Sequence, residues 1–331
     1  MRAVLARRYG PPEALSLEDV PSLVPGPGEV VVAVHAAAVN FPDTLIIEDK
    51  YQIKPPLPFS PGGEVAGVVH RLGAGVTGFA LGDPVIAACR YGGFAEEVVT
   101  TPDRLVPVPR GVGMDSAAAL LMTYGTTHYA LQDCARIAPG ETLLVLGAAG
   151  GTGLSAIELG KLLGARVIAA ASTKEKLALC RERGADETIL YTPQNLKDEV
   201  KRLTGDGGVD VVYDPVGGDY AEPALRAVAW GGRYLVIGFT AGIPKLPMNL
   251  PLLKGCSIVG VFYGAFAKKF PQRYAQLRAE LVEWLAQGKV RPAITARYPL
   301  EQAAQALRLV ADRQVIGKIV LTTALGRGPA E

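Results

Sequence analysis

The chain has 331 residues, 49% of them apolar, and a formal net charge of +2 at pH 7. This length suits two domains, and the apolar fraction supplies a large core, which excludes a disordered chain. A nearly neutral charge without a Lys/Arg run does not favour a nucleic acid or a membrane surface as partner. No apolar stretch reaches the roughly 20 residues of a membrane span, and the charged start is unlike a signal peptide, so a cytoplasmic location is expected.

The first third of the chain predicts a compact β-rich domain with irregular loops. Val30 to Val39 is a nearly continuous apolar run, and shorter runs follow at Ala66 to Val69 and at Pro84 to Ala88. Gly and Pro recur between these runs, as in Pro25 to Gly28, which is typical of turns between short strands.

From about Asp115 onward the pattern changes to alternating strands and helices. Strands are expected at 141–147, 165–171, 187–190, 209–213, 232–238 and 257–261. Helices are expected at 153–163, 174–183, 194–203, 220–228 and 271–287, before a last helix and strand at 300–309 and 317–321. This alternation predicts a parallel sheet covered on both faces.

A glycine-rich turn lies between the first strand and the first helix of this series. It runs from Gly147 to Gly153 and leaves a buried strand to open a helix. Such a turn lets the backbone approach a pyrophosphate, and the helix N-terminus offers unpaired N–H groups to it. The context therefore predicts dinucleotide binding. The residues expected to hold the cofactor here are Gly150, Gly151, Thr152, Gly153 and Leu154.

The end of the second strand indicates which dinucleotide is bound. NAD sites usually place Asp or Glu there to bond the ribose 2′-hydroxyl. Here the strand is followed by Ser172 and, four residues later, by Lys176, with Tyr191 after the third strand. A hydroxyl and a cation suit a 2′-phosphate, so NADPH is the expected cofactor. The alternative is that the lysines near Ser172 are ordinary solvated residues of a helix start.

The cysteines of the chain do not predict a metal site or a disulfide framework. Cys89, Cys134, Cys180 and Cys256 lie far apart and form no CxxC pair. We interpret them as scattered structural thiols.

Several segments together resemble one family. They are Val39 to Asp43, Gly62 to Gly67, Gly73 to Asp83, Gly147 to Gly153, Asp214 to Gly218, and Gly317-Lys318. Over nearly its whole length the chain resembles the medium-chain dehydrogenase/reductase superfamily, in the zinc-independent quinone oxidoreductase (zeta-crystallin-like) family.

The resemblance implies an α/β fold in which a Rossmann domain, a doubly wound parallel sheet, is inserted into a GroES-like β-rich substrate domain. We expect the substrate domain at 1–122 and 265–331 and the Rossmann domain at 123–264, with the active site in the cleft between them. The family also implies a homodimer through the edge of the Rossmann sheet, for which Ile258 to Phe262 is the candidate edge. The alternative for that segment is an internal strand with no partner.

Zinc enzymes of the superfamily carry a Cys in the segment that here contains Asn40, and a His where this chain has Gly63. Neither residue is a good zinc ligand, so no metal is expected. Without a Lewis acid, reduction of an activated acceptor is favoured over alcohol oxidation. Such an acceptor needs alignment with nicotinamide C4 more than strong acids and bases.

The resemblance places Asn40, Asp43 and Tyr51 near the nicotinamide. Tyr51 is expected to donate a proton or a hydrogen bond to a developing oxyanion, and Asn40 to orient it or to bond the cofactor. The alternatives are that Asp43 caps a loop and that Tyr51 shapes the pocket while solvent supplies the proton.

Further cofactor contacts are expected from residues near strand ends and from the chain end. They are Thr126, Gly238, Phe239, Phe262, Tyr263, Gly264 and Lys318. For the aromatic residues among them, plain core packing is the alternative.

The leading hypothesis is an NADPH-dependent quinone reductase that acts on a small-molecule substrate. The alternative within the enzyme class is a reductase of α,β-unsaturated carbonyls such as enones, enoyl thioesters or haloacrylates. A non-catalytic or RNA-binding crystallin-like protein that only binds NADPH is the alternative of another class, and the missing basic stripe argues against RNA.

Overall fold

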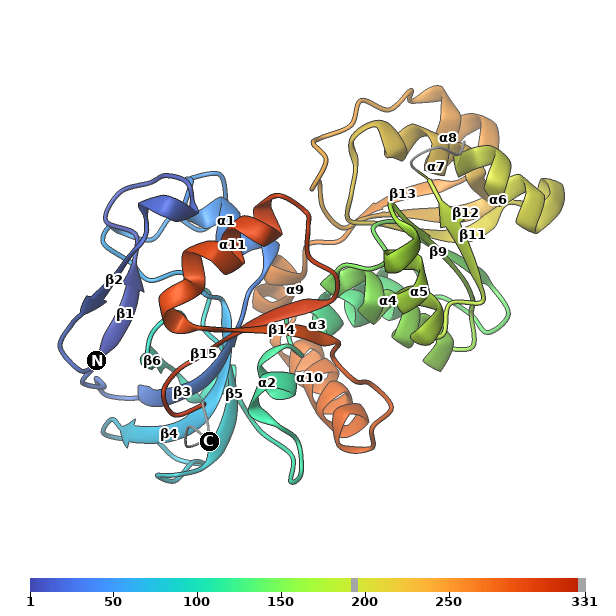
Figure 1. Ribbon diagram of the computed structural model, residues 1–331. Coiled ribbons are helices and arrows are strands. Elements are labelled where there is room, and N and C mark those ends of the chain that lie inside the picture. Colours follow the sequence, from blue (N-terminus) through green and yellow to red (C-terminus); the bar gives the residue numbers. More distant parts are fainter. Residues whose placement is uncertain (192–195, 327–331) are drawn as a thin grey trace. The chain divides into compact units, whose positions relative to one another are not determined.

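The computed structural model describes residues 1–191 and 196–326, which belong to two compact units (Figure 1). Unit 1 is Met1–Met122 with Arg278–Glu331, and unit 2 is Thr123–Leu277, inserted between those two parts. The expected second boundary, at residue 264, lies before the long helix α10 (Pro271–Ala286), whereas the contacts divide the chain within that helix. A local sequence pattern shows where a helix begins, but only packing assigns each half of it to a unit.

Unit 1 is built around β3 (Val30–Ala38), whose valines and alanines are almost all buried. One edge of β3 pairs antiparallel with β4, and the other edge pairs with β6 in its first half and with β15 in its second half. The other strands of this sheet are β4 (Glu64–Leu72), β5 (Pro84–Ala88), β6 (Glu97–Thr100), β7 (Leu105–Pro107), β14 (Ile294–Pro299) and β15 (Lys318–Thr322). Strands β14 and β15 come from the part of the chain that follows unit 2. This sheet therefore joins the two separate segments of unit 1.

Shorter elements cover this sheet. Strands β1 (Arg2–Leu5) and β2 (Ser16–Asp19) form a separate antiparallel pair. The helices of unit 1 are α1 (Phe41–Ile46), α2 (Met114–Ala118) and α11 (Ala303–Ala311), with 3-10 turns η1 (Pro12–Ala14), η2 (Pro102–Arg104) and η6 (Leu300–Gln302). Apolar side chains from β3, β4, α11 and β15 share one core.

Unit 2 contains a parallel sheet whose strands, among the residues described, follow the order β10-β9-β8-β11-β12-β13. Their bounds are β8 (Thr142–Val145), β9 (Arg166–Ala171), β10 (Glu187–Leu190), β11 (Val209–Asp214), β12 (Val228–Val236) and β13 (Ser257–Gly260). In chain order this is 3-2-1-4-5-6, the arrangement of dinucleotide-binding domains. The predicted β-rich domain with an inserted doubly wound sheet is thus confirmed.

Helices connect these parallel strands, as parallel pairing requires. They are α4 (Gly151–Leu162), α5 (Lys174–Glu182), α6 (Leu196–Thr204), α7 (Ala221–Ala227) and α8 (Asn249–Lys254), with 3-10 turns η4 (Gly205–Gly207) and η5 (Gly218–Tyr220). Helix α9 (Tyr263–Lys269) follows the last strand, β13. Ahead of the sheet, α3 (Thr123–His128) continues as the π-helical segment η3 (Tyr129–Cys134). Gln194, the expected start of the helix at 194–203, lies outside the described residues.

One strand differs from the sequence-based expectation. β12 begins at Val228, four residues before the expected start at Gly232, and its pairing with β11 is interrupted by a bulge between Val209 and Val211. Gly231 and Gly232, after Trp230, interrupt the apolar run that would predict a strand here, so the early start was not expected. Within the described part of the chain, no helix is both long and apolar enough to cross a membrane.

Candidate active site and cofactor site

The junction between β3 and α1 carries the first predicted site residues. Asn40 is the N-cap of α1, where an extended backbone precedes the first turn and Asn is favoured. The Asn40 N–H donates to Asp43 Oδ2 at 2.8 Å, and the Asp43 N–H donates to the Asn40 carbonyl oxygen at 3.0 Å. Helix capping therefore places both residues, and both are buried.

A cation faces this junction from the far end of the chain. The antiparallel pairing of β15 with β3 joins Val320 to Ala38 and so brings Lys318 opposite Asn40. Lys318 Nζ donates to Asn40 Oδ1 at 2.7 Å and to the Val39 carbonyl oxygen at 3.1 Å. Lys318, expected as a cofactor contact, is thus a buried partner of Asn40 in unit 1.

A second carboxylate completes the group. Glu64, the first residue of β4, is 1% exposed. Its Oε1 accepts a hydrogen bond from Asn40 Nδ2 at 3.0 Å and lies 3.7 Å from Lys318 Nζ. Its Oε2 accepts the N–H of Met122 at 2.8 Å. We call Asn40, Asp43, Glu64 and Lys318 the charged cluster.

The amide of Asn40 is engaged within this cluster. Its Oδ1 accepts from Lys318, and its Nδ2 donates both to Glu64 and, at 3.3 Å, to the Ala38 carbonyl oxygen. An amide nitrogen has two hydrogens to donate, so both are in use. In this arrangement Asn40 holds neighbouring charged groups in place.

Burial dominates the electrostatics of the charged cluster. It raises the pKa of Asp43 to about 7, while the Asn40 N–H and the Lys318 ammonium act in the opposite direction. Burial also raises the pKa of Glu64 and lowers that of Lys318, and the charge of each partner opposes the shift of the other. Because burial outweighs these attractions, the pKa of Asp43 lies near neutral pH and its carboxyl group takes up a proton there.

Tyr51 lies half-buried at the edge of the unit 1 core, beside this cluster. Burial raises the pKa of its hydroxyl, and the negative charge of Asp43 raises it further. The phenol therefore keeps its proton at neutral pH, as the expected donor must.

Gly63 and Cys89 shape the surroundings of the cluster. A Cβ added at Gly63 would lie 3.3 Å from Met122 Cε and 3.9 Å from Asp43 Oδ1, so any side chain here would face Asp43. The Cys89 thiol donates to the Gly62 carbonyl oxygen at 3.6 Å, and burial raises its pKa to about 12, so it stays a thiol. Across the described ranges, no group of three or more His, Cys, Asp or Glu side chains is arranged to hold a metal ion.

In unit 2 the glycine-rich turn has the geometry that anion binding requires. Gly147 adopts a φ of +55°, which a residue with a side chain rarely does. A Cβ at Gly153 would lie 2.5 Å from the Gly147 carbonyl oxygen, so this close turn excludes a side chain there. Gly150 is the N-cap of α4, and the predicted residues Gly151 and Thr152 form its first turn. Free N–H groups at such a helix start attract a phosphate.

The tip of β9 carries the residues expected to select the 2′-phosphate. Lys176 Nζ donates to Ser172 Oγ at 3.3 Å, so the structure brings the predicted hydroxyl and cation together. Thr173 caps α5 by accepting the Lys176 N–H at 3.2 Å. Tyr191, after β10, packs its ring against Tyr220 at a centroid distance of 4.4 Å.

The predicted nicotinamide-side residues lie on α3, α9 and the loop after β12. Gly125, next to Thr126 on α3, lies against α9, because a Cβ there would be 2.1 Å from the hydroxyl oxygen of Tyr263. Phe262 is the N-cap of α9 and is 55% exposed. Gly264 follows in its first turn.

The loop after β12 contains Gly238, whose N–H donates to the Asp214 carbonyl oxygen at 3.3 Å. Phe239 follows and is 41% exposed. Its ring edge lies 3.1 Å from the Cβ position of Gly217, at the end of the neighbouring strand β11. The strand ends of β11 and β12 thus lie side by side.

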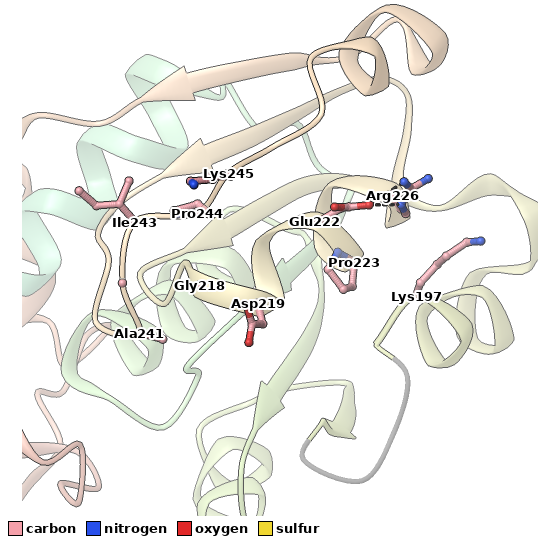
Figure 2. Close-up of a pocket in the computed structure, with 11 residues that line it drawn as sticks. Lys197, Gly218, Asp219, Glu222, Pro223, Arg226, Ala241, Ile243, Pro244 and Lys245 are labelled. Atoms are coloured by element: carbon pink, nitrogen blue, oxygen red, sulfur yellow. Dashed lines mark hydrogen bonds and ion pairs between the residues drawn. The ribbon is translucent and has the colours of Figure 1, made fainter.

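A hollow of about 660 Å³ lies elsewhere in unit 2, between α7, the start of α6 and the loop after β12 (Figure 2). Its lining is Lys197, Gly218, Asp219, Glu222, Pro223, Arg226 and residues 241–245. Arg226 donates twice to Glu222 Oε1, at 2.9 and 2.6 Å, so these charges neutralise each other (Figure 2). None of the predicted cofactor residues lines this hollow.

Sequence reasoning missed Glu64 in unit 1 and a group of buried hydroxyls close to the glycine-rich turn in unit 2. A weak signal for Glu64 was its place directly before the apolar run Val65 to Val69, since a carboxylate that a buried strand carries into the core needs a partner there. Tyr213 and Ser155 carry no such signal, because a Tyr in an apolar strand and a Ser in a helix are ordinary residues there.

Two protein families match separate parts of the chain, close to the division into two units. Residues 26–110 match the family described as "Alcohol dehydrogenase GroES-like domain", and residues 151–283 match the one described as "Zinc-binding dehydrogenase". Quinone oxidoreductase-like protein 2 homolog of Nematostella vectensis is 40% identical over 97% of this chain and 89% of its own length. Quinone oxidoreductase of Rattus norvegicus is 34% identical over 97% of both chains.

The solved structure of Escherichia coli quinone oxidoreductase complexed with NADPH superposes with a TM-score of 0.90. It is 28% identical and covers 97% of this chain and 100% of its own. These likenesses confirm the predicted family: the chain belongs to the medium-chain dehydrogenase/reductase superfamily, among its quinone oxidoreductase-like members.

Proposed function

We propose that the chain is an NADPH-dependent reductase that delivers a hydride to a quinone. The observation that carries the cofactor choice is the end of β9, where Ser172 in place of an acid directly follows the strand and Lys176 donates to its hydroxyl. A cation and a hydroxyl stabilise a 2′-phosphate, whereas a carboxylate would repel it. Relatives named as quinone oxidoreductases, one of them solved with NADPH, support the choice of both cofactor and acceptor.

The turn around Gly150 fits the pyrophosphate of this cofactor. The Cβ position of Gly150 is 3.4 Å from its nearest neighbour, the Gly147 carbonyl oxygen, so its outward face is open. N–H groups at the start of α4 would bind the phosphate oxygens, and Thr126 and Tyr263 would border the nicotinamide. NADPH, when bound, supplies the hydride.

Hydride addition to a quinone leaves an oxyanion that needs one proton. Tyr51 keeps its proton at neutral pH, because burial and the charge of Asp43 both raise the pKa of the phenol. We propose that Tyr51 donates a hydrogen bond and then the proton to this oxygen. The charged cluster would keep Asp43 beside Tyr51.

The test of this function is the oxidation of NADPH by the purified chain with a panel of acceptors. Quinones should be reduced with a higher kcat/KM than enones, enoyl thioesters or a simple alcohol–aldehyde pair. If enones are reduced with a higher kcat/KM than quinones, the substrate class is an unsaturated carbonyl and not a quinone. Binding of NADPH without turnover on any acceptor would contradict the enzymatic proposal.

A Tyr51→Phe variant tests the proton donor. We expect kcat with a quinone to fall by about 100-fold while NADPH affinity stays the same, because general acid catalysis typically contributes this much. Tyr91, an exposed tyrosine of the same unit, supplies the control variant Tyr91→Phe. Unchanged turnover in Tyr51→Phe would contradict the role of proton donor, and Tyr51 would then only shape the pocket.

We further propose that a second copy of the chain pairs with strand β13. Among the described residues this strand ends the sheet order of unit 2, so no strand of this part of the chain pairs with its outer edge. Ile258 on β13 is partly exposed, and Trp230, Leu252 and Leu253 nearby are 81%, 79% and 66% exposed. Two identical edges can pair antiparallel about a twofold axis. Sedimentation should show a dimer that Ile258→Lys dissociates, and a monomeric wild-type chain would contradict this.

A further inference from the structure

Four hydroxyl side chains of unit 2 lie in the glycine-rich turn or close to it. Thr127 belongs to α3, Thr152 and Ser155 to α4, and Tyr213 to the end of β11. Thr127, Ser155 and Tyr213 are completely buried. We call these four residues the hydroxyl cluster.

Short hydrogen bonds connect the cluster. Thr127 Oγ1 lies 2.7 Å from Ser155 Oγ and 2.9 Å from the Tyr213 hydroxyl oxygen. Burial raises the pKa of Tyr213, and hydrogen bonds with the side chains of Thr127 and Thr152 act against that shift. A hydroxyl can donate one hydrogen and also accept, so one chain of bonds joins a strand end to two helices.

The cluster also bonds to backbone groups that matter for the turn. Ser155 Oγ donates to the Thr152 carbonyl oxygen at 2.9 Å, and the Thr123 carbonyl oxygen, at 3.3 Å, shares the same single hydrogen. The first of these lies in the opening turn of α4, and the second lies at the start of α3. The cluster thus connects the helix expected to bind the pyrophosphate with the helix that carries Thr126.

We propose that the hydroxyl cluster positions the opening turn of α4 and Thr126 for the pyrophosphate and nicotinamide of the cofactor, with the Tyr213 hydroxyl as its anchor on the sheet. This rests on the proposed function, since it concerns the same cofactor. Tyr213 and Thr127 are positioning residues that act through the backbone of α3 and α4 and touch no reacting atom. Because preorganised N–H groups bind an anion without reordering, loosening them costs affinity.

The experiment compares two ligands in matched variants. Tyr213→Phe and Thr127→Val each remove one hydroxyl with little change in volume, and Thr127→Ser restores the hydroxyl. Tyr124→Phe is the control, because Tyr124 also joins α3 to α4, through a 2.6 Å bond to Glu158, but lies outside the cluster. NADPH is titrated by fluorescence, and 2′-AMP, which has the 2′-phosphate but neither pyrophosphate nor nicotinamide, is titrated by competition.

We expect Tyr213→Phe and Thr127→Val to weaken NADPH about 5-fold, as loss of one buried hydrogen bond predicts, with 2′-AMP binding unchanged. Thr127→Ser and Tyr124→Phe should retain wild-type affinity for both ligands. Should Tyr213→Phe not fold, the Thr127 pair gives the same comparison. Equal loss for the two ligands, no loss for NADPH, or an equal loss in Tyr124→Phe would overturn the proposal. Wild-type protein that binds no NADPH would instead refute the proposed function, before any variant is measured.

Discussion

The charged cluster of unit 1 and the hydroxyl cluster of unit 2 are both largely buried but differ in chemistry. In unit 1, Asp43, Glu64 and Lys318 bury charges around Asn40, and burial raises the pKa of Asp43 to about 7. In unit 2, Thr127, Ser155 and the rest of the hydroxyl cluster are neutral. Ionised groups inside a protein need partners and respond to pH, whereas hydroxyls need only geometry. The difference suits a proton-handling site in one unit and a rigid cofactor platform in the other.

The largest expected effect tests whether charge holds the unit 1 cluster together. Lys318→Met removes the ammonium and leaves the carboxyl groups of Glu64 and Asp43 buried without it. We expect the free energy of unfolding to fall by about 3–5 kcal/mol at neutral pH, measured by urea denaturation.

Lys318→Arg is the matched control for this variant. It keeps the charge, so its loss should be smaller, about 1–3 kcal/mol from the added bulk. The loss in Lys318→Met should shrink at about pH 5, where the carboxyl groups take up protons. Equal stability of Lys318→Met and the wild type would show that the ammonium contributes nothing to the cluster.

The next prediction concerns stability as a function of pH, which should differ between the charged cluster of unit 1 and the hydroxyl cluster of unit 2. The pKa of Asp43 is raised from 3.8 to about 7 in the folded chain, so between these values the folded state holds a proton that the unfolded state has lost. Stability due to Asp43 therefore falls as pH rises through this window and levels off above about pH 7. Asp43→Asn should remove a change in stability on the order of 4 kcal/mol over that range, relative to the wild type.

Two controls accompany this measurement. Asp19→Asn, at an exposed residue of β2, should leave the wild-type slope in place. Tyr213→Phe should change stability by the same amount at about pH 5 and about pH 8, because a phenol does not titrate there. A slope that persists in Asp43→Asn would place the titrating proton elsewhere.

The smallest effect concerns a charge of unit 2 that lies near its surface. Lys176→Met removes the cation beside Ser172, and we expect kcat/KM for NADPH to fall about 10-fold with kcat/KM for NADH unchanged, as for one charge-assisted hydrogen bond. Lys174→Met, two residues earlier at the start of the same helix, is the control. A wild-type preference for NADH, or an equal loss in both variants, would argue against this site for the 2′-phosphate.

Much of unit 2 could be predicted, because its signals are local. The parallel sheet was predicted from the alternation of apolar strands with helices, and the cofactor site from the turn between Gly147 and Gly153. The contact between Ser172 and Lys176 was also predicted, because the two residues are close in sequence. The early start of β12 at Val228 was missed, because a bulge and glycines break the strand pattern. The hydroxyl cluster escaped prediction, since its bonds join residues 28 and 86 positions apart.

For unit 1 the sequence by itself determined the β-rich texture and, through the resemblance, the importance of Asn40, Asp43 and Tyr51. Only the tertiary structure decided what these residues contact. Lys318 is 278 positions from Asn40, and Glu64 is 24 positions from it. The pairing of β15 with β3 and of β3 with β4 brings them together. Strand register sets such contacts, and register depends on the packing of the whole sheet, which no local pattern of residues encodes.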